Sequence, residues 1–217
     1  IDPPASERPM NIEPCLILPV RWPEQKPETG HLYDIGVDLG KTVSATVITV
    51  WDKTSFPWTL SYYRRMLRAT WPVVKAVVTT LQQQWCPVEA SGRRTGRVYV
   101  DSTGLDPIFD DLRLAGVPVT GVRFTGGEGQ ERQRLLDKLA IGLEKKLIRI
   151  PREEQFVREF NAMRRILSDK TGRTAWEPLE GHTSDCVFSS ALGLYDLPVD
   201  RDTIRKRRAP DLYVEAV

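Results

Sequence analysis

The sequence predicts an α/β fold in which a mixed central sheet is flanked by helices. Three apolar segments between residues 33 and 66 follow one another closely and are typical of strands. From residue 72 onward the apolar spacing becomes helical, and helices then alternate with short strands. Strands joined by tight turns pair antiparallel, whereas strands separated by helices pair parallel. We therefore expect an antiparallel meander extended by parallel strands.

The meander is predicted from residue alternation. Its first strand has the sequence YDIGVDL, in which apolar residues alternate with Asp34, Gly36 and Asp38. Residues 44–50 are rich in Thr, Val and Ile, which favour strands, and residues 58–66 form the third segment. A turn at Gly40 and Lys41 joins the first two strands.

The later elements are predicted from apolar spacing and from Pro and Gly at their ends. Helices are expected over residues 72–85, 105–115, 130–146, 153–168 and 182–194. Strands are expected over residues 97–101, 117–124 and 147–150, and a turn with a short strand over residues 172–178.

Composition indicates one core with extensions at both ends. A chain of 217 residues with 41% hydrophobic content can bury a single sizeable core. Residues 1–30 hold seven of the 16 prolines and are predicted to be a linker, residues 31–197 the domain, and residues 198–217 a basic tail. Because the chain begins with Ile and a linker-like segment, we expect a fragment of a longer protein.

Several classes of protein are disfavoured. The three cysteines are widely spaced and include no C-x-x-C pair, which argues against a disulfide framework and a structural zinc site. No apolar run is long enough to cross a membrane. The net charge of +2 permits a polyanionic partner without requiring one.

The chemistry is expected where strands end. Asp38 closes the first strand, Asp101 closes the strand after the first helix, and Asp185 lies in the first turn of the last helix. A carboxylate in an apolar strand is costly unless it is paired, and converging carboxylates suit Mg²⁺ or Mn²⁺. Each residue also has a structural interpretation that stays open: Asp101 as a turn residue and Asp185 as a helix N-terminal carboxylate.

Four segments resemble a known family: VYVDSTGLDPIFDDL, VTGVRFT, QRLLDKLAIGLEKK with LIRIP after it, and GHTSDCVFSSALGLY. Together they resemble the nuclease domain of the large terminase subunit of tailed bacteriophages, a member of the RNase H-like superfamily, over residues 33–195. The resemblance implies an RNase H-like sheet. It also implies an acidic triad from the first strand, the fourth strand and a C-terminal helix, which correspond to Asp38, Asp101 and Asp185.

The activity implied by the resemblance is endonuclease cleavage of concatemeric double-stranded viral DNA, with little sequence specificity, during genome packaging. Asp38 would bridge two Mg²⁺ or Mn²⁺ ions, and Asp101 and Asp185 would each complete one site. The implied partners are an N-terminal packaging ATPase domain of the same protein, the portal protein and the small terminase subunit. The implied location is the host-cell cytoplasm, at the viral procapsid, with no membrane association.

Four further residues are candidates near this site. His182 lies one helical turn before Asp185 and would orient it, or would cap the helix or face solvent. Lys41 and Lys138 are candidates for phosphate contact, and Asp106 is an auxiliary ligand or a helix cap. Members of the family often carry an acidic residue where this chain has Ser184, which is expected to weaken the second ion.

Other functions stay open. A catalytically weak module that docks DNA or the portal protein would keep the fold, and a Holliday-junction resolvase would keep the metal chemistry. Gly40-Lys41-Thr42 suggests a phosphate-binding loop, but Ile35 stands where that motif requires Gly. The same stretch is similar to the phosphate-binding hairpin of actin-like ATPases, which need two such lobes, whereas this chain holds one.

Overall fold

The fold is built on a seven-stranded mixed sheet with the order β1-β7-β4-β3-β2-β5-β6. The computed structural model describes residues 9–40, 45–89, 92, 95–103, 106–124, 130–167 and 174–200. The strands of the sheet are β1 (Leu16–Ile17), β2 (Tyr33–Asp38), β3 (Ala45–Asp52), β4 (Trp58–Leu67), β5 (Val98–Asp101), β6 (Val119–Val122) and β7 (Ile148–Pro151). β2, β3 and β4 pair antiparallel, whereas β5 and β6 extend β2 in parallel and β7 pairs parallel with β4. The predicted combination of a meander and parallel strands is confirmed.

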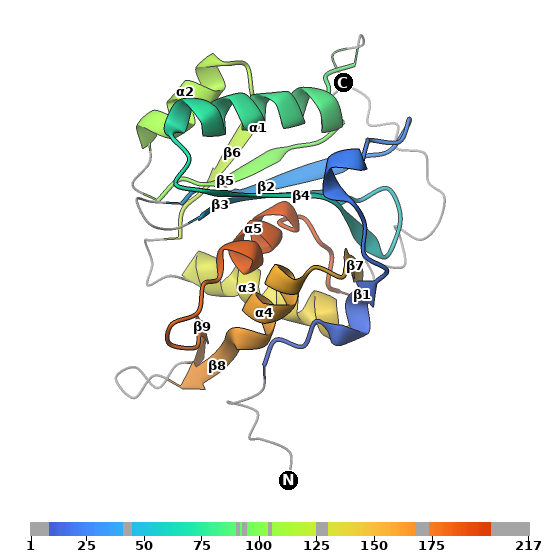
Figure 1. Cartoon of the computed structure of the whole chain (residues 1–217), viewed down its shortest axis with the longest axis vertical. Helices are drawn as coiled ribbons and strands as arrows, with labels where there is room; N and C mark the ends of the chain where they lie inside the picture. The colour runs from blue at the N-terminus through green and yellow to red at the C-terminus, as the bar shows by residue number, and fades with distance from the viewer. Residues whose placement is uncertain are drawn as a thin grey trace.

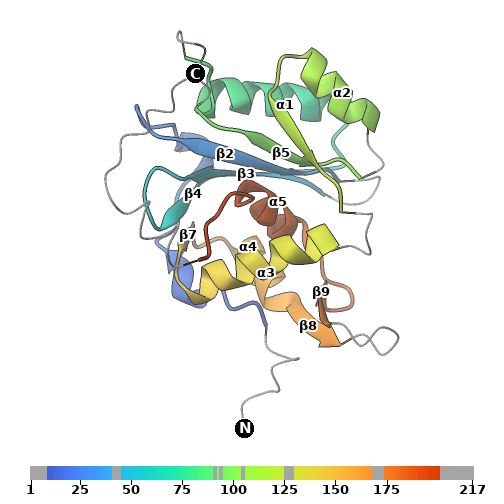
Figure 2. The same ribbon diagram turned by 180° about the vertical axis from the view of Figure 1, so that it is seen from behind.

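Helices cover both faces of the sheet, so the molecule has three layers (Figures 1 and 2). One face carries α1 (Trp71–Trp85) and α2 (Asp106–Leu114). The opposite face carries α3 (Gln130–Glu144), α4 (Glu154–Ala162) and α5 (Asp185–Gly193). Within the described ranges, none of these helices is long and apolar enough to cross a membrane.

Residue alternation in β2 divides the interior into two cores. Ile35 and Val37 are fully buried in the core under α1 and α2. The alternate residues of β2, including Gly36 and Asp38, face the helices on the other side. The central strand therefore carries its acidic residues on the α5 side.

The α5 helix lies directly on β2 and β3 because Gly36 has no side chain. A Cβ atom at Gly36 would lie 2.0 Å from the Ser189 carbonyl oxygen and 2.3 Å from the Gly193 nitrogen. Two hydroxyl groups close the contact: Thr49 Oγ1 donates to the Ser189 carbonyl at 2.9 Å, and Ser189 Oγ donates to the Gly36 carbonyl at 3.0 Å. The close approach thus sets the position of α5 over the strands.

The predicted helix over residues 153–168 is wrong in its second half. α4 ends at Ala162, and Met163–Leu167 forms β8, which pairs antiparallel with β9 (Thr174–Pro178) in a separate hairpin. Apolar residues continue at helical spacing past residue 162, but Ile166 is 45% exposed because the hairpin takes it away from the core. The backbone pairing partner lies beyond a local window, so tertiary pairing overrides the local pattern.

Part of the predicted linker belongs to the core. Met10, Ile12 and Cys15 are buried among the residues under α3 and α4. β1 forms a short edge strand on β7, as expected for residues 15–20. The boundaries of linker, domain and tail stay a prediction, and the basic residues 205–208 lie outside the described residues.

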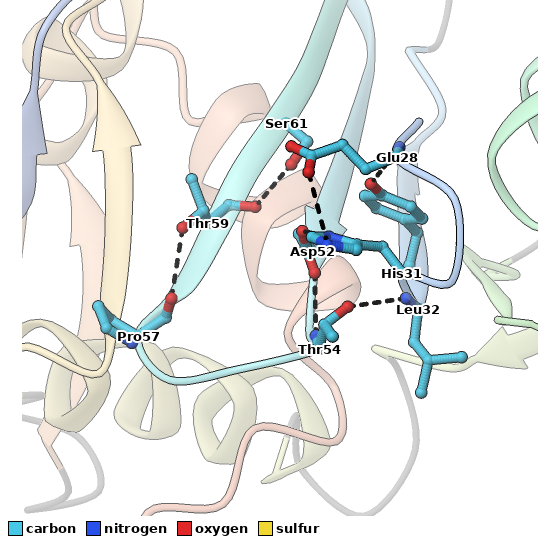
Figure 3. Close-up of polar contacts among 9 residues, drawn as sticks. Glu28, His31, Leu32, Asp52, Thr54, Pro57, Thr59 and Ser61 are labelled. Atoms are coloured by element: carbon cyan, nitrogen blue, oxygen red, sulfur yellow. Dashed lines mark hydrogen bonds and ion pairs between the residues drawn. The ribbon is translucent and has the colours of Figure 1, made fainter. Parts of the chain in front are cut away.

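A polar cluster holds the start of β2 against the end of β3 (Figure 3). His31 Nδ1 lies 2.6 Å from Asp52 Oδ2, and the Leu32 amide donates to Thr54 Oγ1 at 2.8 Å. Tyr33 pairs with Asp52 in the sheet, so this cluster marks the end of β2 opposite to Asp38. It fixes where the central strand begins.

We predict that Gly36→Ala destabilises the fold by about 3 kcal/mol, because a methyl group there meets the α5 backbone, which has no free rotamer to adopt. Urea denaturation measures the loss. Gly142→Ala is the matched control: its Cβ would meet only the end of the Leu197 side chain, at 2.7 Å, and the expected change is below about 1 kcal/mol. Equal stability of the two variants would contradict the role assigned to Gly36.

Candidate functional site

Two of the three predicted aspartates lie at neighbouring strand ends. β2 and β5 pair in parallel with Val37 opposite Val100, so the next residues, Asp38 and Asp101, stand level with each other. Adjacent strands are about 4.8 Å apart. The sheet therefore brings these two carboxylates side by side, as predicted.

The strand β2 carries two acidic residues on one face, and only one of them has a counter-ion within the described part of the chain. Asp34 is fully buried, and its carboxylate accepts from Lys53 Nζ at 2.6 Å and from the Arg97 amide at 2.9 Å. Among the described residues, no hydrogen bond or ion pair reaches the Asp38 carboxylate. Burial, and then the negative charges of Asp185, Asp101 and Glu159, raise the pKa of Asp38 well above its usual value. This is the environment of a carboxylate that a bound cation would stabilise.

Asp185 is the first residue of α5, on the helix that crosses β2. Its Oδ2 is buried, has no hydrogen-bond partner among the described residues, and lies 3.9 Å from Arg65 Nη2. Burial raises the pKa of Asp185, and the charge of Glu159 raises it further. The Ala45 backbone amide and Arg65 oppose this shift. An orphaned, buried carboxylate oxygen is a position that a cation can occupy.

Asp101 combines two roles. Its Oδ1 accepts a hydrogen bond from the Thr103 amide at 2.9 Å, which confirms the turn interpretation for this residue. The Asp101 charge also contributes to the raised pKa of Asp38. The turn therefore holds the carboxylate in place beside Asp38.

Glu159 is a further acidic residue of the site, and the sequence analysis missed it. It lies on α4, is 1% exposed and accepts hydrogen bonds from Gln155, Thr183 and the Cys186 amide. The signal was present, because Glu159 stands on the same helix face as Phe156 and beside Phe160, both fully buried. A glutamate on the apolar stripe of an amphipathic helix indicates a specific partner.

The donor chemistry of the site fits a hard divalent cation. Carboxylate oxygens are the ligands that Mg²⁺ and Mn²⁺ prefer, and Asp38 and Asp185 both lack full compensation from the described residues. In the same part of the chain, however, no three His, Cys, Asp or Glu side chains lie close enough to form a complete metal site. Asp38, Asp101 and Asp185 therefore stay predicted ligands.

The accessory candidates have separate outcomes. His182 is exposed and lines a surface pocket of about 550 Å³ beside α4, together with Arg158, Asn161 and Leu179. Lys138 Nζ donates to the Tyr195 carbonyl and lies over the Tyr195 ring, so its ammonium group is engaged within the chain. Lys41 and the side chain of Asp106 lie outside the described residues.

Neither a scan against models of protein families nor a search of curated proteins matched this sequence. Solved structures do match it. A large terminase nuclease from thermophilic phage G20c is 22% identical, with a TM-score of 0.72, over 85% of this chain and 95% of that one. The same nuclease with bound magnesium gives a TM-score of 0.75 over 88% of this chain and 98% of that one.

Two more structures agree with this result. The large terminase nuclease domain of Thermus phage P74-26 is 22% identical, with a TM-score of 0.70 over 84% of this chain and 91% of that one. The large terminase of another thermophilic bacteriophage is 14% identical, with a TM-score of 0.61, and the match covers 89% of this chain and 46% of that one. The chain thus has the RNase H-like fold of large terminase nucleases, which confirms the predicted fold.

We predict that Asp38→Asn is more stable than the parent protein at pH 7 by about 0.5–2 kcal/mol without divalent cations, because the substitution removes a buried charge surrounded by like charges. A folded-state pKa above the unfolded value means that stability is lost as the pH rises through that raised pKa. The advantage of the variant should therefore shrink as the pH falls toward about 4, the usual pKa of Asp. Urea denaturation between about pH 4 and pH 8 measures it.

Asp34→Asn is the control of opposite sign on the same strand. It leaves the Lys53 ammonium, which is 19% exposed, without its partner and should cost about 3 kcal/mol. If Asp38→Asn destabilises the protein as much as Asp34→Asn does, Asp38 has a stabilising partner, and a cation is not needed to compensate its charge.

Proposed function

We propose that this chain is a metal-dependent endonuclease that hydrolyses double-stranded DNA. The observation that carries the proposal is the buried Asp38 carboxylate, which is surrounded by like charges at the end of the central strand. The fold adds support, because it is shared with a phage G20c terminase nuclease whose structures include bound magnesium and bound cobalt. A site of negative charge cannot hold a DNA phosphate unless cations neutralise it.

The three aspartates have distinct tasks in this proposal. Asp38, level with Asp101 and under the start of α5, lies between the other two carboxylates and would contact both cation positions. Asp101 and Asp185 would each complete one position. Divalent cations bound there would activate water and stabilise the leaving oxygen. The reaction would break the P–O3′ bond and leave a 3′-hydroxyl and a 5′-phosphate.

The proposed setting is viral genome packaging. The match to the large terminase that is 14% identical covers 46% of that protein, which agrees with a chain that represents one part of a larger protein. We propose that a packaging ATPase domain belongs to the same protein and that the portal protein and the small terminase subunit are its partners. The proposed location is the host-cell cytoplasm, at the viral procapsid.

A docking module without strong catalysis is the second candidate. One observation favours it: the acidic side chains of the described residues do not form a complete three-ligand site. In that case the domain would bind DNA or the portal protein and would cut only when other parts of the motor assemble around it. The two candidates differ in whether the isolated chain cuts DNA.

We expect the purified chain to nick and linearise supercoiled plasmid in Mn²⁺ or Mg²⁺ and to be inactive in EDTA. Asp38→Asn and Asp185→Asn should each reduce cutting by about a hundredfold or more, because each removes a carboxylate ligand. Gel electrophoresis over a time course measures the rates. Asp111→Asn is the control, since Asp111 lies on α2 across the sheet and binds Trp71 and Lys75.

Two outcomes would move the assignment. Absence of cutting in every metal by a folded protein would favour the docking module. Preferential cutting of a four-way junction over linear and supercoiled duplex would favour a junction resolvase.

Divalent cations should also stabilise the protein in the absence of DNA. A ligand at about a hundred times its Kd adds about 2.7 kcal/mol to the stability of the state that binds it. Thermal unfolding should therefore shift upward with Mn²⁺ for the parent and for Asp111→Asn, and much less for Asp38→Asn. An equal shift for Asp38→Asn would place the ion elsewhere.

A further inference from the structure

The Glu159 carboxylate joins α4 to the first turn of α5. Its Oε1 accepts from Gln155 Nε2 at 2.6 Å and from Thr183 Oγ1 at 2.7 Å. Its Oε2 accepts from the Cys186 backbone amide, also at 2.6 Å. A buried carboxylate needs hydrogen-bond donors of this kind. Both of its oxygens are thus engaged within the chain.

The first turn of α5 depends on a group from outside its own segment. A helix N-terminus presents amides that have no partner within the helix, and the N-cap side chain usually accepts from one of them. Here the N-cap residue Ser184 makes no side-chain capping bond. Glu159 supplies the acceptor from α4 and places a negative charge at the positive end of the α5 dipole.

This contact acts on Asp185 directly. Asp185 precedes Cys186, so the amide held by Glu159 belongs to the peptide unit that joins these two residues. Thr183, held through its hydroxyl, lies two residues before Asp185. The backbone on both sides of the Asp185 side chain is therefore tied to one carboxylate.

Glu159 does not serve to neutralise the site, because its charge adds to the negative charge around Asp38 and Asp185. Nor are its oxygens open to a cation, since each already accepts a strong hydrogen bond. What it contributes is the geometry of the α5 N-terminus.

We propose that Glu159 is a positioning residue that anchors the first turn of α5 and thereby holds the Asp185 carboxylate at the end of the central strand. The proposal rests on the metal-dependent nuclease proposed above for the role of Asp185. The anchor itself is a property of the chain without metal or DNA, and it can be tested without either.

Hydrogen exchange tests the anchor. Glu159→Gln keeps the shape but replaces one acceptor oxygen by a donor, so one of the α5 contacts is lost. Amides in the first turn of α5 should then exchange about tenfold faster or more, while amides of α1 on the opposite face keep their rates. Thr183→Val removes one donor from the α5 side and should give a smaller increase.

Gln155→Met is the matched control. It removes the other donor to the same Oε1, but that donor lies on α4, so the exchange rates in α5 should stay at the parent level. Unchanged α5 exchange in a folded Glu159→Gln variant would overturn the anchor. A rise in Gln155→Met equal to that in Glu159→Gln would also overturn it, because any loss of packing would then be enough.

The Mn²⁺ dependence tests the positioning role. In Glu159→Gln the Mn²⁺ concentration for half-maximal binding, measured by calorimetry, should rise about tenfold, and excess Mn²⁺ should restore most of the cutting rate. A parent-like Mn²⁺ dependence in a variant with faster α5 exchange would reduce Glu159 to a structural cap. If the parent neither binds Mn²⁺ nor cuts DNA, the proposed nuclease fails, and the exchange rates still decide whether Glu159 anchors α5.

Discussion

The position of the candidate site depends on the contact between α5 and the central strand at Gly36. The helix backbone lies where a side chain would otherwise stand, with the Ser189 carbonyl 2.0 Å from the position of a Cβ on Gly36. Gly193 allows the same approach from the helix side, where its own Cβ would meet Trp51 at 2.4 Å. This pair of glycines lets one helix reach both acidic strand ends, because a larger separation would carry Asp185 away from Asp38.

The electrostatics of β2 separate a structural carboxylate from a functional one. Asp34 is fully buried and has a cation within the chain, so its charge contributes to the folded state. Asp38, four residues later on the same face, is surrounded by Asp101, Asp185 and Glu159. The fold tolerates this repulsion because strand pairing and helix packing hold the backbone in place. Uncompensated charge maintained in this way is typical of a binding site for an oppositely charged ligand.

Residue alternation and apolar spacing were sufficient to predict the meander, the parallel extension and the aspartates at the strand ends. Two features could not be predicted from local patterns. Residues 163–167 continue a helical spacing, yet they pair with residues 174–178, a partner that a local window does not contain. Met10 and Ile12 lie in a proline-rich segment but are buried under distant helices. Glu159 was missed because its partners, Thr183 and Cys186, lie 24 and 27 residues along the chain.

The α5 helix is held at two points, and together they determine where Asp185 lies. Its second half is fixed to the sheet through Ser189 and Gly193, whose contacts are with Gly36 and Thr49. Its first turn is fixed to α4 through Glu159. Contact with the sheet alone would leave the N-terminal turn able to fray, since helix ends lack internal partners. A carboxylate repelled by its neighbours would then turn toward solvent, so the second attachment is the one that keeps Asp185 directed at the strand ends.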